Sequence, residues 1–145
     1  MTRKKNGGRS TLNGTHRLAI IAASRANAGR GILQRGMCQA WTRECYEQLY
    51  GLMFEDHHKA SAHLAMRSWQ NTPYAVDASE GSLPGDILYI AASWRNRHGH
   101  VGIRVLGNRI AENSTRRSGR VRGGVGFVSL AEFGRVSLIV RLPRA

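Results

Sequence analysis

The sequence predicts an α+β fold in which helices precede a small antiparallel sheet. Up to residue 69, apolar residues recur three or four positions apart, as on one face of a helix. From residue 86 the apolar residues instead form short runs separated by turn residues, which is typical of strands. The dipeptide Gly107-Asn108 lies between two such runs and indicates a β-hairpin. Helices followed by a strand meander favour an α+β domain.

Three helices are predicted in the first half of the chain. The second has the clearest pattern, because its apolar residues fall at i, i+3, i+4, i+7 and i+11 on one face. A glycine follows each of the first two helices, where a helix commonly ends. The predicted ranges are 15–28, from Met37 or Cys38 to Tyr50, and 59–69.

Four strands are predicted in the second half of the chain, at residues 86–92, 100–106, 109–113 and 136–142. The segment Leu83-Pro84-Gly85-Asp86 leads into the first of them. Proline at the second position and glycine at the third predict a type II turn there.

The length and composition favour one catalytic or binding domain rather than two. The chain has 145 residues, of which 41% are hydrophobic, and this suits a single modest core. Residues 1–14 are polar and basic with nothing to bury, so we expect a disordered tail followed by one domain over 15–145. No apolar run is long enough to span a membrane. No apolar stretch follows the basic start, so no secretory signal is predicted and we expect synthesis in the cytoplasm.

The charge is strongly positive and unevenly distributed. The chain carries 22 Lys and Arg against 9 Asp and Glu, a formal net charge of +13. Such a charge favours polyanionic partners, among them nucleic acid, anionic polymers and acidic membrane surfaces. The densest basic segment is a predicted loop, interrupted by Gly and Ser, that contains Arg116, Arg117, Arg120 and Arg122. This loop either binds anions or is a solvated loop without a dedicated partner.

Cys38 is the candidate nucleophile. It stands at or near the start of the second predicted helix, where unpaired backbone N–H groups and the helix dipole favour negative charge. A thiol in such a field ionises more readily and is a better nucleophile, although a small buried apolar residue is the alternative interpretation. Cys45 lies two helical turns further on, roughly 10 Å away, so we expect no disulfide and assign Cys45 to the core.

His100 is the candidate base. It begins an apolar strand between two glycines, and an imidazole there could activate a nucleophile on a facing helix. Glu112 and Asn113 follow on the next predicted strand, where a carboxylate or amide could orient the ring. Because side chains alternate along a strand, only one of the two can point at His100. Taken singly, His100 could equally be an edge histidine and Glu112 a hairpin residue.

Together these segments resemble the CHAP and NlpC/P60 cysteine hydrolases of the papain-like superfamily. The resemblance covers about residues 15–143 and is most specific where Pro-Gly-Asp enters a strand and Gly-His-Val begins another. It is carried by Gly36-Met37-Cys38-Gln39-Ala40-Trp41, Pro84-Gly85-Asp86-Ile87-Leu88, Gly99-His100-Val101-Gly102-Ile103 and Glu112-Asn113. The resemblance implies a papain-like fold and cleavage of amide bonds in peptidoglycan.

The resemblance also implies a role for each matching residue. Cys38 would be the nucleophile and His100 the base, with Glu112 as the third residue and Asn113 as the alternative. CHAP members often have one spacer between Glu and Asn, whereas Glu112 and Asn113 are adjacent here. The oxyanion would be held by the Cys38 backbone N–H and by a donor from the preceding loop, for which Gln34 is the candidate.

Trp94 is a candidate for substrate binding, and the cysteines and histidines do not predict a metal site. Trp94 precedes His100 in a loop that would border the substrate cleft, so it either stacks on a sugar or peptide or covers the core. The cysteines lack zinc-site spacing, and His57, His58 and His63 form no i, i+4 pair. His98 and His100 would share a strand face and supply two ligands at most. We therefore expect neither a metal nor another cofactor.

The function implied is a peptidoglycan endopeptidase or amidase that works through an acyl-enzyme. A small basic hydrolase without a signal resembles a phage lysin or a virion-associated lytic protein, which would reach the wall after release or within the virion. We expect a monomer whose basic loop could hold anionic wall polymers. The alternative, based on charge alone, is a non-enzymatic nucleic-acid-binding or virion-assembly protein.

Overall fold

The computed structural model describes residues 17–29, 37–114 and 124–143, and it confirms the predicted α+β fold. Within these residues, four helices accompany a six-stranded sheet in which every paired strand is antiparallel. The basic tail, the basic loop around Arg116 and the candidate donor Gln34 lie outside the described residues. No helix in the described part of the chain is long and apolar enough to cross a membrane.

The sheet has the strand order β1-β6-β2-β3-β4-β5. Its centre is the meander of β2, β3 and β4. The hairpin predicted at Gly107-Asn108 joins β3 to β4, and both of its residues have positive φ. The C-terminal strand β6 inserts between β1 and β2. The bounds are β1 Ala75–Val76, β2 Ile87–Ile90, β3 His100–Val105, β4 Arg109–Asn113, β5 Val125–Ser129 and β6 Leu138–Val140.

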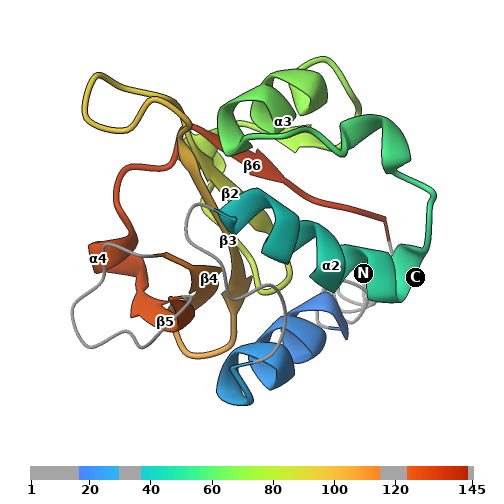
Figure 1. The fold of residues 1–145 in the computed structure, drawn as a ribbon, viewed down its shortest axis with the longest axis vertical. Helices are drawn as coiled ribbons and strands as arrows, with labels where there is room; N and C mark the ends of the chain where they lie inside the picture. The colour runs from blue at the N-terminus through green and yellow to red at the C-terminus, as the bar shows by residue number, and fades with distance from the viewer. Residues whose placement is uncertain (1–16, 30–36, 115–123, 144–145) are drawn as a thin grey trace, which may run out of the picture.

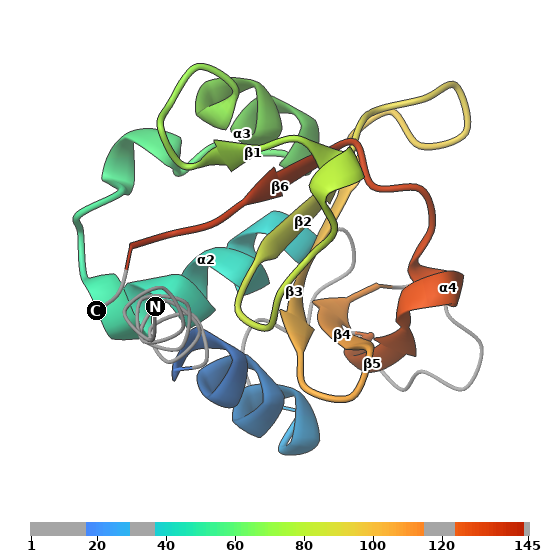
Figure 2. The same cartoon turned by 180° about the vertical axis from the view of Figure 1, so that it is seen from behind.

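Helix α2, Cys38–Tyr50, is the helix that crosses the sheet next to the candidate site. It begins after Met37 and ends at Gly51, whose φ of 61° suits a glycine, so the predicted boundaries are confirmed. The predicted apolar face is buried, with Trp41 and Cys45 completely inaccessible. Helix α2 packs against β3 and β4, and it lies with the helix over residues 17–27 on one face of the sheet (Figures 1 and 2).

Helix α3, Ala62–Trp69, begins three residues later than predicted from the apolar pattern. The reason is the Ser61 side chain, which accepts a hydrogen bond from the Leu64 N–H and caps the helix there. Two short 3-10 turns, η1 Glu55–His57 and η2 Ala78–Glu80, lie on either side of α3 in the chain.

Two clusters of buried side chains lie on the two faces of the sheet. The larger cluster joins α2, α3 and the helix over 17–27 to the sheet. The smaller one consists of Leu88, Ile110, Val128, Phe133 and Ile139. Phe133 comes from α4, Leu130–Phe133, which follows β5 directly (Figures 1 and 2). The second face of the sheet near β3 is therefore covered by a C-terminal helix that the sequence pattern did not predict.

The Pro-Gly-Asp segment forms the predicted turn and also anchors the last strand. Asp86 N–H donates to the Leu83 carbonyl at 3.0 Å, and Gly85 has a φ of 95°, as a type II turn requires. The Asp86 carboxylate is inaccessible and accepts hydrogen bonds from Arg141 Nε at 3.0 Å and Nη2 at 2.8 Å. This bidentate pair ties the start of β2 to the residue after β6.

Candidate active site

Cys38 is the first residue of α2, and its side chain lies at the edge of the core. The residue is 9% exposed, whereas Cys45, seven positions later, is completely buried and both thiols are free. Burial raises the pKa of Cys45 to about 12, which keeps that thiol protonated. Met37 precedes α2, and its side chain makes no capping hydrogen bond to the helix. The first backbone N–H groups of the helix lie beside Cys38.

The sheet places His100 and Glu112 on one face. His100 is the first residue of β3, and Gly102, two positions later, pairs with Glu112 on β4. Residues two apart on a strand share a face, and so do directly paired residues on adjacent strands. His100 Nε2 and Glu112 Oε1 are accordingly 2.7 Å apart, a short hydrogen bond. Glu112 is completely buried, and the His100 side chain is 13% exposed.

Asn113, the alternative third residue, points to the other face of β4. It pairs with Val125 of β5 and is buried. The observed register, which pairs Gly102 with Glu112, therefore makes Glu112 and not Asn113 the partner of His100.

Cys38 lies close enough to His100 for its thiol to influence the pKa of the ring. Burial lowers the pKa of His100, but the hydrogen bonds to Cys38 and Glu112 and the negative charges of both partners outweigh it and raise the pKa to about 9. At neutral pH the ring is therefore an imidazolium between two potential anions.

The packing around His100 holds its ring in place. The Phe133 ring centroid lies 5.3 Å from that of His100, at an interplanar angle of 37°. A Cβ on Gly102 would meet Ile110 Cγ2 at 2.6 Å and Phe133 Cε1 at 3.1 Å. Glycine at position 102 thus lets Phe133 approach the strand beside the His100–Glu112 pair.

A buried hydrogen-bond chain behind Cys38 was not found by sequence reasoning. Trp69 Nε1–H donates to Tyr89 Oη at 3.2 Å, and Tyr89 O–H donates to Gln39 Oε1 at 3.1 Å. These three residues come from α3, β2 and the start of α2, so the chain fixes the end of α2 that carries Cys38. Burial raises the pKa of Tyr89, which keeps its hydroxyl a donor. Sequence separations of 20 and 50 residues hid this chain from local pattern analysis.

Trp94 does not cover the core, because it is 85% exposed. Its loop, between β2 and β3, projects from the body of the molecule and leads directly to His100 (Figures 1 and 2). Of the two interpretations left open by the sequence, only a surface role fits this placement.

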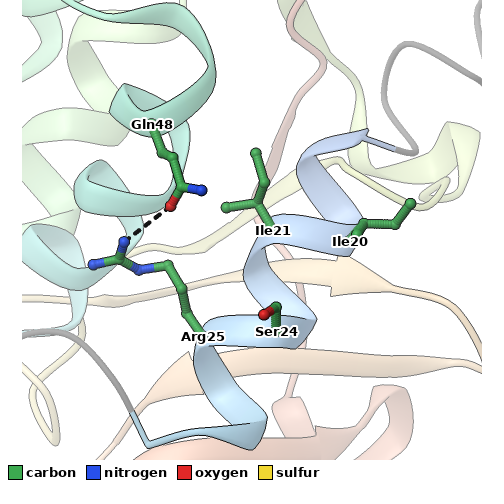
Figure 3. A pocket seen from close by; sticks show the side chains of 5 residues that line it. All are labelled: Ile20, Ile21, Ser24, Arg25 and Gln48. Carbon is green, nitrogen blue, oxygen red and sulfur yellow. Dashed lines mark hydrogen bonds between the residues drawn. The ribbon is translucent and has the colours of Figure 1, made fainter.

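The remaining candidates supply no second reaction centre. In the described ranges 17–29, 37–114 and 124–143, no three His, Cys, Asp or Glu side chains are grouped so as to hold a metal ion. A hollow between the helix over 17–27 and α2 is lined by Ile20, Ile21, Ser24, Arg25 and Gln48 (Figure 3). Arg25 donates to Gln48 Oε1 at 3.0 Å and to Glu44 Oε1 at 2.6 Å, so a hydrogen bond and a salt bridge join the two helices beside this hollow.

The chain shares its fold with Ly7917. The crystal structure of Ly7917 aligns with a TM-score of 0.56 and 18% identity over 86% of this chain. The crystal structure of Ly7917 with the hydrolyzing product of MDP aligns with a TM-score of 0.51 and 19% identity over the same share. In both cases this chain spans 62% of the length of the Ly7917 chain. No protein-family model and no curated protein sequence matches the chain.

Proposed function

We propose that this protein is a cysteine-dependent hydrolase that cleaves a peptide or amide bond of peptidoglycan. The observation that carries the proposal is that Cys38, the first residue of α2, influences the pKa of His100, whose ring is hydrogen-bonded to the buried Glu112. A thiol that can ionise, an imidazole beside it and a buried carboxylate behind the imidazole are the three groups that thiol hydrolysis requires. The same three positions match the CHAP and NlpC/P60 pattern, which supports membership of that group.

Acylation starts from a thiolate–imidazolium pair. The Cys38 sulfur attacks the carbonyl carbon, a C–S bond forms, and the carbonyl electrons move onto the oxygen. In this proposal the backbone N–H of Cys38, at the start of α2, holds the oxyanion. As the oxyanion collapses, the C–N bond breaks and the His100 imidazolium gives its proton to the leaving nitrogen. Glu112 stabilises the imidazolium and keeps the ring oriented.

Deacylation returns the site to its resting state. His100, now neutral, takes a proton from a water molecule that attacks the thioester carbonyl. The C–S bond breaks, a carboxylic acid product leaves, and the Cys38 thiolate and the His100 imidazolium are restored. In one turnover His100 gives one proton to the leaving nitrogen and takes one from water, so the balance closes without a cofactor.

The proposed substrate is supported by the Ly7917 fold and by charge. Ly7917 has been crystallised with the hydrolyzing product of MDP, muramyl dipeptide, which is a peptidoglycan fragment. A net charge of +13 would hold this protein on an anionic wall, an attraction that salt weakens. We extend the proposal to a phage-type lytic role, in which the enzyme acts on the wall after release or from a virion.

The test compares two cysteine variants on purified peptidoglycan. Cys38→Ala should lower the rate of turbidity loss by at least about a thousandfold, because the nucleophile is removed. Cys45→Ala is the matched control and should retain lysis, since Cys45 is buried in the core. Mass analysis of the released fragments identifies the bond that is cut. Undiminished lysis by a folded Cys38→Ala protein would overturn the proposal, and salt-dependent DNA binding without any lysis would favour the nucleic-acid alternative.

A further inference from the structure

The loop between β2 and β3 is a tightly hydrogen-bonded hairpin rather than an irregular connection. Ser93 N–H donates to the Asn96 carbonyl at 2.9 Å, and Asn96 N–H donates to the Ser93 carbonyl at 3.2 Å, which leaves Trp94 and Arg95 at the tip. The Asn96 side chain adds a bond from Nδ2 to the Gly99 carbonyl at 2.8 Å. The tip therefore has a defined conformation before any ligand arrives.

The base of this hairpin is docked on α3. His63 N–H donates to the His98 carbonyl at 2.9 Å, and His63 Nδ1 accepts from the Ala92 N–H at 3.0 Å. Gly99 is buried against this contact, where an added Cβ would lie 2.5 Å from the Ile90 carbonyl oxygen. The hairpin is thus held at both ends, one residue away from His100.

The tip presents an aromatic ring and positive charge to solvent. Trp94 is 85% exposed, and the Arg95 guanidinium lies 4.9 Å from its ring centroid. At that exposure the ring face not covered by Arg95 is open. Arg97 is also exposed, and residues 87–111 contain no Asp or Glu. An exposed tryptophan with one arginine against its ring and a second exposed arginine three residues on fits a ligand that offers an apolar ring face together with anionic groups.

We propose that this hairpin is a substrate-binding arm for the glycan part of peptidoglycan. Trp94 stacks on a sugar ring of the strand, and Arg95 and Arg97 pair with carboxylates of the peptides attached to it. The six residue-to-residue steps from Trp94 to His100 span at most about 20 Å, so one polymer can occupy the arm and the Cys38–His100 site together. This inference rests on the proposed function, and it assigns the substrate class recognised beside that site.

Single-stranded nucleic acid fits the arm less well. Proteins that bind it stack successive bases on several aromatic side chains along a groove. Among the large apolar side chains exposed in the described part of the chain, Trp94 is the one aromatic, the others being Ile20, Leu52, Met53, Leu64 and Leu106. One ring at a projecting tip suits one sugar ring next to a cleavage site.

The burial of the other tryptophans gives a direct binding assay. Trp41 and Trp69 are completely buried, so acrylamide quenching of the full-length protein reports on Trp94. In Cys38→Ala protein, an uncross-linked glycan fragment carrying its peptides should protect the fluorescence from acrylamide. Arg95→Gln combined with Arg97→Gln should weaken that binding and flatten its salt dependence. The proposed binding arm would be overturned if a saturating concentration of the fragment left the acrylamide quenching unchanged. It would also be overturned if oligothymidine protected the fluorescence equally well.

Kinetics separate the arm from the reaction itself. Trp94→Ala should raise KM about tenfold and leave kcat nearly unchanged, and Trp94→Tyr should restore most of the loss. Leu106→Ala, a half-exposed residue on the opposite hairpin of β3, is the matched control and should change neither constant. An unaltered KM in Trp94→Ala would overturn the arm while lysis by the parent protein still stood. If the fragment protected Trp94 but the parent cut nothing, the proposed reaction would fail and the binding arm would stand.

Discussion

His100 Nε2 lies 2.7 Å from Glu112 Oε1, and the Glu112 side chain has no solvent exposure. A carboxylate buried to this degree needs a cationic or strongly donating partner, and the imidazolium of His100 provides it. In return, Glu112 helps to keep His100 protonated at neutral pH, with its pKa raised to about 9. The protonated ring is the form that the proposed reaction uses to release the amine.

Glu112→Gln should move the alkaline limit of activity to lower pH. The imidazolium must be present for the leaving nitrogen to be protonated, so wild-type activity should fall as pH rises through about 9. Without the carboxylate charge the pKa of His100 falls, and the limit should move down by about one unit or more. The measurement is kcat/KM against pH on a soluble muropeptide. Glu55→Gln, at an exposed position, is the control, and an unshifted limit in Glu112→Gln would show that Glu112 does not set the protonation of His100.

The same pair makes stability depend on pH. The folded pKa of His100, about 9, is above the ordinary value of 6.5, so protonation favours the folded state. That stabilisation is complete below about pH 6.5 and is lost as the pH rises through about 9. In His100→Ala the free energy of unfolding should lose this alkaline decline, which urea titrations at pH 6 and pH 10 would measure.

Gly102→Ala should damage both stability and activity. The added Cβ would lie 2.6 Å from Ile110 Cγ2 and 3.0 Å from the Ala111 carbonyl oxygen, so backbone must move. We expect the free energy of unfolding to fall by about 1–3 kcal/mol, as for other overpacked cores. Because Gly102 pairs with Glu112, the same displacement should lower kcat. Thermal unfolding measures the first effect, and an unchanged melting temperature would contradict the packing described here.

Arg141→Gln should be among the most destabilising single changes. It leaves the inaccessible Asp86 carboxylate without its bidentate partner, which costs about 3–5 kcal/mol for a buried ion pair broken on one side. Arg43→Gln is the matched control, because Arg43 pairs with Glu47 on the surface of α2 and should cost under about 0.5 kcal/mol. Equal effects of the two changes on urea unfolding would show that the Asp86 pair does not anchor β6.

The sequence predicted those parts of the fold that local chemistry decides. The apolar period and Gly51 defined α2, and Pro84-Gly85 defined the turn before β2. The segments that were missed are short and depend on distant partners. The strand β1 has two residues and exists through β6, while α4 has four residues. The strand β5 contains a glycine and forms because β4 pairs with it.

In the candidate site, too, local features could be predicted from the sequence and contacts between distant residues could not. Cys38 at a helix start and His100 at a strand start are visible in the sequence, and strand alternation leaves one of Glu112 and Asn113 to face His100. Which one does so depends on the register that pairs Gly102 with Glu112, and no local pattern fixes that register. The Tyr89–Gln39 bond and the Phe133 ring beside His100 join residues far apart in the chain, so only the folded structure reveals them.

The most direct test of the central claim is the alkylation of Cys38 by iodoacetamide at pH 6.5, followed by peptide mass analysis. We expect fast modification of Cys38, because it is the proposed nucleophile at the start of α2 beside the His100 ring, and none of Cys45, which is buried. His100→Ala should slow the reaction at Cys38 by at least about tenfold. Slow modification of Cys38 in the parent protein, or an unchanged rate in His100→Ala, would contradict the thiolate–imidazolium pair.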